Sequence, residues 1–396
     1  MMEMRTSKKS GDSVSLLGFG MMRLPRIVPD KPEIDKEAAQ KMVDYAYEHG
    51  VNYYDTAYPY HEGLSELFTG EALKKYPRDS FYLATKMPSW LLNGKDDAPR
   101  IFEEQLGKLQ VEYFDYYLLH SIGKSYEEDF EGRYLKTGAL DFLLEQKEKG
   151  KIRNLGFSFH GNMDVFEKIV AYRDWDFVQI QMNYQDWDTQ NAKRLYEILE
   201  EKGIPCIVME PVRGGNLVTL CEESQKILKA IEPDNSIASW AIRFAATYPN
   251  VLTVLSGMTA MEHVTDNVKT MSDFKPLTDS DMKALQSALD AYLNTGTIPC
   301  TGCRYCMDCP AGVDIPAVFD LYNQCASQGM LPVSFADASD FEKRVEAFTR
   351  IYGSLPEENR AKNCVECGAC TEPCPQSIKI PRKLRDIASL AANFGL

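Results

Sequence analysis

The chain has 396 residues, of which 44% are hydrophobic, and a formal net charge of −14. This length suits one large domain with a smaller one attached, and the negative charge argues against nucleic acid and anionic membranes as bulk partners. The N-terminus is polar and basic, and the longest apolar region, 237–257, is interrupted by Arg243 and Pro249. We therefore expect neither an export signal nor a membrane anchor, and a cytoplasmic protein.

Residues 14–270 alternate short apolar runs with stretches of helical spacing. The runs that we expect to be strands are 16–20, 52–57, 81–86, 114–120, 152–159, 177–183, 205–211 and 252–257. Helices expected between them include 36–49, 99–109, 140–149, 163–172 and 189–202. Apolar strands that alternate with helices indicate a parallel sheet buried on both faces. The predicted fold class is therefore α/β, a (β/α)8 barrel with its active site at the carboxyl ends of the strands.

The composition changes to Cys, Pro and Gly from about Thr297 onward. We therefore predict two domains, residues 1–296 for the barrel and 297–396 for a smaller unit. Helical spacing returns in 315–327, 341–351 and 382–392, so the smaller domain should be mainly α-helical.

Eight cysteines of this tail form two tight runs that indicate iron–sulfur clusters. They are Cys300, Cys303, Cys306 and Cys309, then Cys364, Cys367, Cys370 and Cys374, with a proline after the last cysteine of each run. The second run has the C-x2-C-x2-C-x3-C-P spacing of bacterial ferredoxins, in which the fourth thiolate binds the neighbouring cluster. The first run is one residue shorter. The alternatives are zinc, which would need only paired C-x2-C elements, and disulfides, which accompany secretion.

Carried over from ferredoxins, this spacing implies two [4Fe–4S] clusters with crossed ligands. One cluster would be held by Cys300, Cys303, Cys306 and Cys374, and the other by Cys364, Cys367, Cys370 and Cys309.

Polar side chains at the ends of consecutive predicted strands resemble a known catalytic set. Asp55 and Tyr60 lie in Y-D-T-A-Y-P-Y, Lys86 in Y-L-A-T-K, and His120 in D-Y-Y-L-L-H-S. In this order they are similar to the Asp, Tyr, Lys, His tetrad of the aldo-keto reductases. L-G-F-G-M, which contains Gly20 and Met21, G-K-I-R-N-L-G-F-S-F-H and Q-I-Q-M-N-Y also resemble that family. With the cysteine-rich tail, nearly the whole chain resembles the branch with a TIM barrel followed by a ferredoxin-like domain.

The resemblance implies an oxidoreductase that reduces a small carbonyl compound or oxidises an alcohol. Tyr60 would be the proton donor, and its ordinary pKa near 10 makes it too weak an acid alone. Lys86 should favour tyrosinate formation electrostatically, with Asp55 holding Lys86 in place. His120 should orient the substrate oxygen.

The resemblance also implies NAD(P)(H) as cofactor. Its contacts would come from Gly20, Met21, Ser158, Gln181, Ser256, Gly257 and Asn267, with Met209 covering the nicotinamide ring and Arg213 reaching the pyrophosphate. Many relatives have Lys and Arg for the NADP 2′-phosphate where this chain aligns Gly257 and His263, so a preference for NADP is doubtful.

The two halves leave several functions open, because nicotinamide moves two electrons and a cluster moves one. FMN could mediate, with its phosphate against Gly214 and Gly215 or against Ser256 and Gly257. The clusters could instead drive the reaction with electrons from ferredoxin or flavodoxin, docked on K-I-P-R-K-L-R at 379–385. A redox-sensing regulatory protein is an alternative of another class. Trp90 and Trp187 could line an aromatic substrate pocket.

Overall fold

Eight parallel strands close into a barrel in the computed structural model of the chain, which describes residues 1–28, 31–123, 125–332 and 338–396. The order around the barrel is β10-β3-β4-β5-β6-β7-β8-β9. These strands are β3 (Leu17–Gly20), β4 (Tyr53–Asp55), β5 (Tyr82–Pro88), β6 (Phe114–Ile122), β7 (Ile152–Phe159), β8 (Phe177–Gln181), β9 (Cys206–Met209) and β10 (Val251–Gly257). All eight coincide with predicted strands, and the predicted (β/α)8 fold is confirmed.

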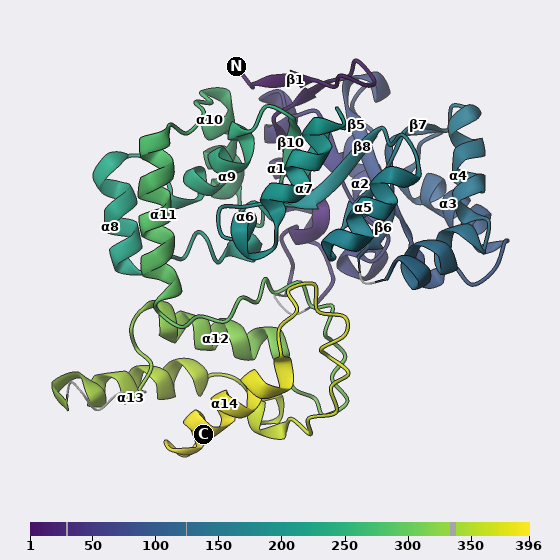
Figure 1. The fold of residues 1–396 in the computed structure, drawn as a ribbon. Coiled ribbons are helices and arrows are strands. Elements are labelled where there is room, and N and C mark those ends of the chain that lie inside the picture. Colours follow the sequence, from purple (N-terminus) through teal and green to yellow (C-terminus); the bar gives the residue numbers. More distant parts are fainter. Residues whose placement is uncertain (29–30, 124, 333–337) are drawn as a thin grey trace. The chain divides into compact units, whose positions relative to one another are not determined.

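Helices cover the outside of the barrel (Figure 1). They are α1 (Lys36–Glu48), α2 (Leu64–Leu73), α3 (Asp97–Leu109), α4 (Ala139–Glu148), α5 (Met163–Tyr172), α6 (Asp186–Thr189), α7 (Ala192–Glu201), α9 (Ile237–Thr247) and α10 (Met261–Ser272). The expected helix 189–202 corresponds to α7. The helices α2, α6, α9 and α10, and the hairpin of β1 (Met4–Thr6) and β2 (Ser13–Ser15), were not among the expected elements. Gly50 follows α1 with φ +91°, a conformation that glycine tolerates at a helix end.

Alternate residues of the strands fill the barrel interior. This buried cluster includes Tyr53, Ala84, Tyr116, Leu118 and Phe177. Residues two apart share one face of a strand, so Asp55, Lys86 and His120 continue the same inward face toward the carboxyl ends. The candidate catalytic groups therefore lie directly above a packed apolar core.

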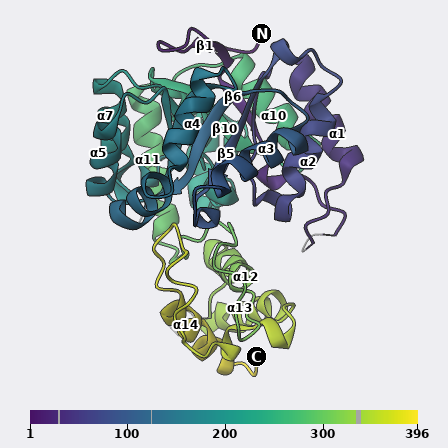
Figure 2. The same ribbon diagram turned by 90° about the vertical axis from the view of Figure 1, so that its right-hand side faces the viewer.

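A second unit combines two separate stretches of chain, Val212–Ile237 and Thr278–Leu396, whereas the barrel unit comprises Met1–Pro211 and Ala238–Leu277. In the second unit α8 (Glu222–Ile231) packs against α11 (Asp279–Leu293). Helix α12 (Ile315–Ser327) packs against both α13 (Ala338–Tyr352) and α14 (Ile380–Ala392), as Figure 2 shows. The predicted helical character of the tail is confirmed. The segment Val212–Ile237, which we placed in the barrel domain, groups with this tail.

None of the described helices is both long and apolar enough to cross a membrane.

Candidate active site and cysteine cages

The four residues of the predicted tetrad meet at the carboxyl ends of β4, β5 and β6. Lys86 Nζ lies 2.7 Å from Asp55 Oδ1 and 3.4 Å from Tyr60 Oη, and it donates to Thr56 O at 2.7 Å. The side chains of Lys86 and Asp55 are only 1% and 4% exposed. The ring of His120 faces Tyr60 edge-on, with centroids 6.4 Å apart. The structure therefore assembles a lysine, a carboxylate, a phenol and an imidazole at one point.

His61 holds the turn that carries Tyr60. Its Nε2 accepts a hydrogen bond from the backbone N–H of Leu24 at 3.2 Å, so its Nδ1 is the donor to Pro32 O at 3.1 Å. This buried ring fixes the chain directly after Tyr60.

Burial is the largest cause of the pKa shifts of the four tetrad residues. It raises the pKa of Asp55 and lowers that of Lys86, while the attraction between the two charges opposes both shifts. Burial, Asp55 and Glu210 raise the pKa of Tyr60 well above 10, with Arg23 opposing them. We expected Lys86 to favour tyrosinate. The phenol is instead kept protonated, because a charge at Oη would lie in a desolvated site near two carboxylates.

His120 is held as a neutral imidazole. Burial, Lys86 and His160 lower its pKa well below 6.5. Its backbone N–H donates to Tyr134 Oη at 2.9 Å, and that hydroxyl donates to Met87 O at 2.9 Å, which fixes the end of β6. Among the described residues its buried Nδ1 has no hydrogen-bond partner. The ring centroids of Trp90 and His120 lie 5.3 Å apart, and Trp90 is half-exposed. This is the position expected of a residue that forms a wall of the substrate pocket.

A second histidine, which was not predicted from the sequence, lies at this site. His160 follows β7, and burial together with the charge of Lys86 lowers its pKa to about 4. The letters S-F-H at the end of a predicted strand were the available signal.

The predicted nucleotide contacts at β3 and β10 also come together. Gly257 pairs with Gly20, and a Cβ on Gly20 would lie 3.2 Å from Ser256 O. Asn267 Nδ2 donates to Ser256 Oγ at 3.0 Å, and the buried Met21 begins the turn after β3. Arg23, which sequence analysis did not single out, packs its stem against Gly257. At this edge of the barrel the backbones of β3 and β10 therefore lie close together, and the side chain of Arg23 lies beside them.

Ser158, Gln181 and Met209 lie at the ends of β7, β8 and β9, which are neighbours in the barrel. Ser158 Oγ accepts from Ser121 N–H at 3.0 Å, and Gln181 Nε2 donates to the buried Asp186 at 2.6 Å. Met209 Sδ accepts from Gln179 Nε2 at 3.4 Å. These hydrogen bonds orient the three side chains at the carboxyl ends of three neighbouring strands.

Arg213 and Gly214 belong to the second unit. The guanidinium of Arg213 donates to Pro299 O and to Gln376 Oε1. A Cβ on Gly214 would lie 2.1 Å from Thr301 O, so the Thr301 backbone fills the space that we assigned to a phosphate.

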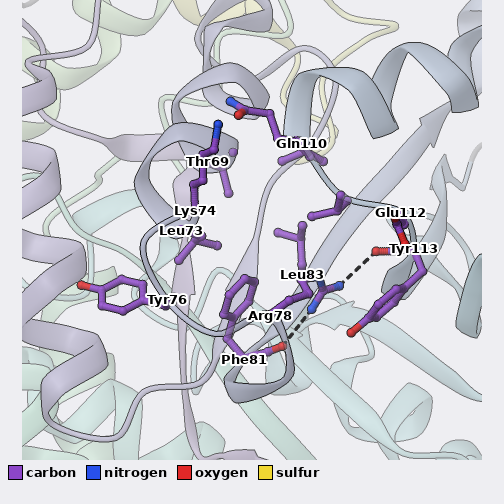
Figure 3. A pocket seen from close by; sticks show the side chains of 13 residues that line it. Thr69, Leu73, Lys74, Tyr76, Arg78, Phe81, Leu83, Gln110, Glu112 and Tyr113 are labelled. Atoms are coloured by element: carbon purple, nitrogen blue, oxygen red, sulfur yellow. Dashed lines mark hydrogen bonds between the residues drawn. The ribbon is translucent and has the colours of Figure 1, made fainter.

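Two further features lie outside the candidate site. Trp187 stacks on Tyr248 at 4.3 Å between ring centroids and contacts Phe244 of α9 edge-on at 5.6 Å. A cavity of about 310 Å³ is lined in part by Phe81 and Tyr113, which precede β5 and β6. Figure 3 shows the side chains that line it. Arg78 there donates to Phe81 O and Tyr113 O. This cavity therefore lies at the amino ends of these strands, opposite the tetrad.

The eight tail cysteines surround two cavities in the crossed arrangement. One cavity is lined by Cys300, Cys303, Cys306 and Cys374, which we call Cage I. The other is lined by Cys309, Cys364, Cys367 and Cys370, which we call Cage II, together with Cys306. Burial raises the pKa of Cys306 to about 12, and the further contributions from Cys303, Cys300 and Cys374 place it with Cage I.

The two runs adopt the same backbone pattern. The second residue after the first cysteine is left-handed in both, Gly302 with φ +64° and Glu366 with φ +53°. The backbone N–H of each of these residues points at the sulfur of that first cysteine, at 3.4 Å. Each run is followed by a helix that begins with Ile-Pro, α12 after the first run and α14 after the second. The two runs therefore share the local structure around their first cysteine and the sequence that starts the following helix.

The side chains that line the two cavities include the thiols of all eight tail cysteines, the ligand type of iron–sulfur clusters. All eleven cysteines are free of disulfides. Among the described residues, no three His, Cys, Asp or Glu side chains are grouped to hold one metal ion. Thiols that line a cavity suit a multi-iron cluster, which is larger than a four-coordinate zinc.

Comparison with known proteins agrees with both halves of the chain. The sequence model of the aldo/keto reductase family matches residues 16–290, and that of the 4Fe-4S dicluster domain matches residues 299–378. A probable aldo-keto reductase of Glycine max is 28% identical over 213 residues, 52% of this chain and 58% of that protein. The NADH-specific methylglyoxal reductase of Escherichia coli is 24% identical over 70% of this chain and 96% of its own length.

A solved structure agrees as well. The holo form of an aldo-keto reductase from Bacillus halodurans superimposes with a TM-score of 0.60 at 26% identity, covering 73% of this chain and 96% of that one. With the family model matched over most of the barrel, the chain is an oxidoreductase that belongs to the aldo/keto reductase family and carries a C-terminal 4Fe-4S dicluster domain.

Proposed function

We propose that the barrel reduces a small carbonyl compound, or oxidises the corresponding alcohol, with Tyr60 as the proton donor. The observation that carries this proposal is the buried Lys86 ammonium, placed between Asp55 Oδ1 and Tyr60 Oη. The raised pKa of Tyr60 keeps a proton on Oη until an oxygen with developing negative charge approaches. Lys86 then stabilises the phenolate that remains, and His120 orients the substrate oxygen.

Nicotinamide is the cofactor that these residues fit. Reduced nicotinamide, when bound, supplies a hydride to the carbonyl carbon. Gly20, Met21, Ser256, Gly257 and Asn267 would bind the nucleotide part. Ser158, Gln181 and Met209 would hold the nicotinamide ring. Support comes from membership of the family and from the E. coli relative, whose name states that it uses NADH.

The test is turnover by anaerobically purified protein with NADH or NADPH and a panel of small carbonyl compounds. Tyr60→Phe removes only the hydroxyl, so kcat should fall by at least about 10²-fold with little change in cofactor affinity. Tyr58→Phe is the matched control, because the Tyr58 hydroxyl bonds Glu104 outside the tetrad. A near-normal rate for Tyr60→Phe would remove the proposed role. Analysis of released cofactors would show whether FMN is present.

A second candidate function is that the clusters accept single electrons from a small acidic carrier such as ferredoxin or flavodoxin. It is favoured by the exposure of Cage II, where Cys367 is exposed and Val365 is 69% exposed. Helix α14 lines the same cavity with Pro381 and Leu384 and carries Arg382, Lys383 and Arg385 on its exposed positions. A basic surface beside an accessible cluster would attract an acidic carrier.

Reoxidation of reduced ferredoxin by the protein, at several ionic strengths, tests the second candidate. The rate should fall with added salt, and it should fall further when Arg382 and Lys383 are changed to Gln. A rate that responds to neither would make this surface irrelevant to electron entry. The assembled tetrad favours an enzyme over a purely regulatory redox sensor.

A further inference from the structure

Arg213 connects the two cysteine runs that contribute to Cage I. Its Nη1 donates to Pro299 O at 3.2 Å, directly before Cys300, and its Nη2 donates to Gln376 Oε1 at 2.7 Å, two residues after Cys374. Arg213 is only 2% exposed. A single buried guanidinium therefore binds both chain segments that the crossed cage has to hold together.

Residues next to Arg213 contact the same cage. Asn216 Nδ2 donates to Cys300 O at 2.6 Å. Gly214, with φ +68°, approaches so closely that a Cβ would lie 2.1 Å from Thr301 O. Thr301 and Gln376 both line the Cage I cavity. The turn 213–216 is therefore built against the backbone of Cage I.

The backbone of this turn is specialised. Arg213 has φ +52°, a conformation that is unfavourable for a residue with a side chain. Such a conformation persists where the surrounding contacts over-determine it. Here those contacts are the bonds of Arg213 and Asn216 to the residues around Cys300 and Cys374.

We propose that Arg213 and Asn216 are positioning residues of Cage I, and that the permanent charge of Arg213 raises the reduction potential of the cluster held there. The inference rests on the proposed [4Fe–4S] clusters. Reduction adds a negative charge to a cluster, and a nearby guanidinium, which is always protonated, stabilises that charge. Asn216 is uncharged, so it should hold the loop of Cys300 without changing the potential.

The test compares full-length, anaerobically purified variants by iron and sulfide content, electron paramagnetic resonance and potentiometric titration. Arg213→Gln should lower the midpoint potential of the Cage I cluster and leave that of Cage II unchanged. Arg213→Lys keeps the charge and should restore most of the potential. Asn216→Ala should accelerate iron loss from Cage I at an unchanged potential. The paramagnetic resonance signals of the two clusters are assigned with Cys374→Ala, which removes a ligand of Cage I, and Cys309→Ala, which removes a ligand of Cage II.

Arg360→Gln is the matched control. Its guanidinium lies in the same unit and donates to the backbone oxygens of Leu355 and Gly353, which lie outside both cysteine runs. This variant should change neither potential. Two clusters with unchanged potentials in Arg213→Gln would overturn the inference and leave the clusters in place. Absence of iron from the wild-type protein would instead overturn the proposed clusters themselves. If Arg213→Gln does not fold, iron loss from Cage I that is no faster in Asn216→Ala than in the wild type would overturn the positioning role.

Discussion

The tetrad and the cysteine cages differ in how their side chains are positioned. Asp55, Lys86 and His120 stand on adjacent strands whose register is fixed by backbone pairing, as between Lys86 and Leu118. The thiols of Cage I and Cage II come from loops with left-handed residues such as Gly302 and Glu366. A packed barrel therefore orients the first site, whereas the second depends on segments far apart in the sequence.

The difference predicts how each site responds to loss of a group. When one group of the tetrad is removed, the packed strands should keep their structure and the protein should lose catalytic activity. A site built from loops around a cluster should lose its structure, because binding of the cluster is coupled to folding.

The largest effect should come from Cys374→Ala. This change removes a ligand that the second run contributes to Cage I, so the protein should lose about half of its iron, and the fold of the tail should loosen. Iron content and limited proteolysis would measure both effects. Cys325→Ala, at a fully buried thiol of the same unit, is the control. Loss of the Cage II signal instead would contradict the crossed ligation.

Lys86→Met should show the opposite pattern, with chemistry lost and the fold retained. We expect kcat to fall by at least about 10²-fold, because Tyr60 loses its neighbouring charge. The buried Asp55 is left unpaired, which should lower the free energy of unfolding by about 3–5 kcal/mol. The double variant Asp55→Asn, Lys86→Met should recover most of that stability and none of the activity. Denaturant unfolding and steady-state kinetics separate the two effects. Recovery of activity in the double variant would argue against a catalytic role for the charge.

The smallest effect concerns pH and His160. Burial lowers its pKa to about 4 in the folded protein, against an ordinary value of 6.5. Between these values the unfolded state binds more protons, so stability should fall as pH drops from about 6.5 to about 4 and be unaffected above that window. The loss should be about 1–2 kcal/mol, less than the full shift implies because the ring is half-buried. Urea unfolding of His160→Asn against wild type at pH 7 and pH 5 measures this loss, with the exposed His49→Asn as control. A difference in unfolding free energy between His160→Asn and wild type that is the same at both pH values would contradict this prediction.

The strands and the tetrad could be predicted from the sequence because each has a local signal. Apolar runs mark the strands, and Asp55, Lys86 and His120 follow them at the expected ends. Arg23 and His160 were missed because a single polar residue after a strand is not distinctive. The grouping of Val212–Ile237 with the tail could not be predicted, since the bonds of Arg213 to Pro299 and Gln376 join loops that have no periodic pattern.

The discontinuous second unit limits how the protein can be dissected. A chain shortened at Gly296 would keep Arg213, Gly214 and Asn216 and lose Pro299, Cys300 and Gln376, their partners. A buried guanidinium without acceptors is costly, so such a truncated barrel would carry a defect of its own. Loss of activity on truncation would then say little about whether electrons pass through the clusters. The same interleaving means that the cysteine-rich tail is not a module that could be transplanted to another barrel by joining it at one point.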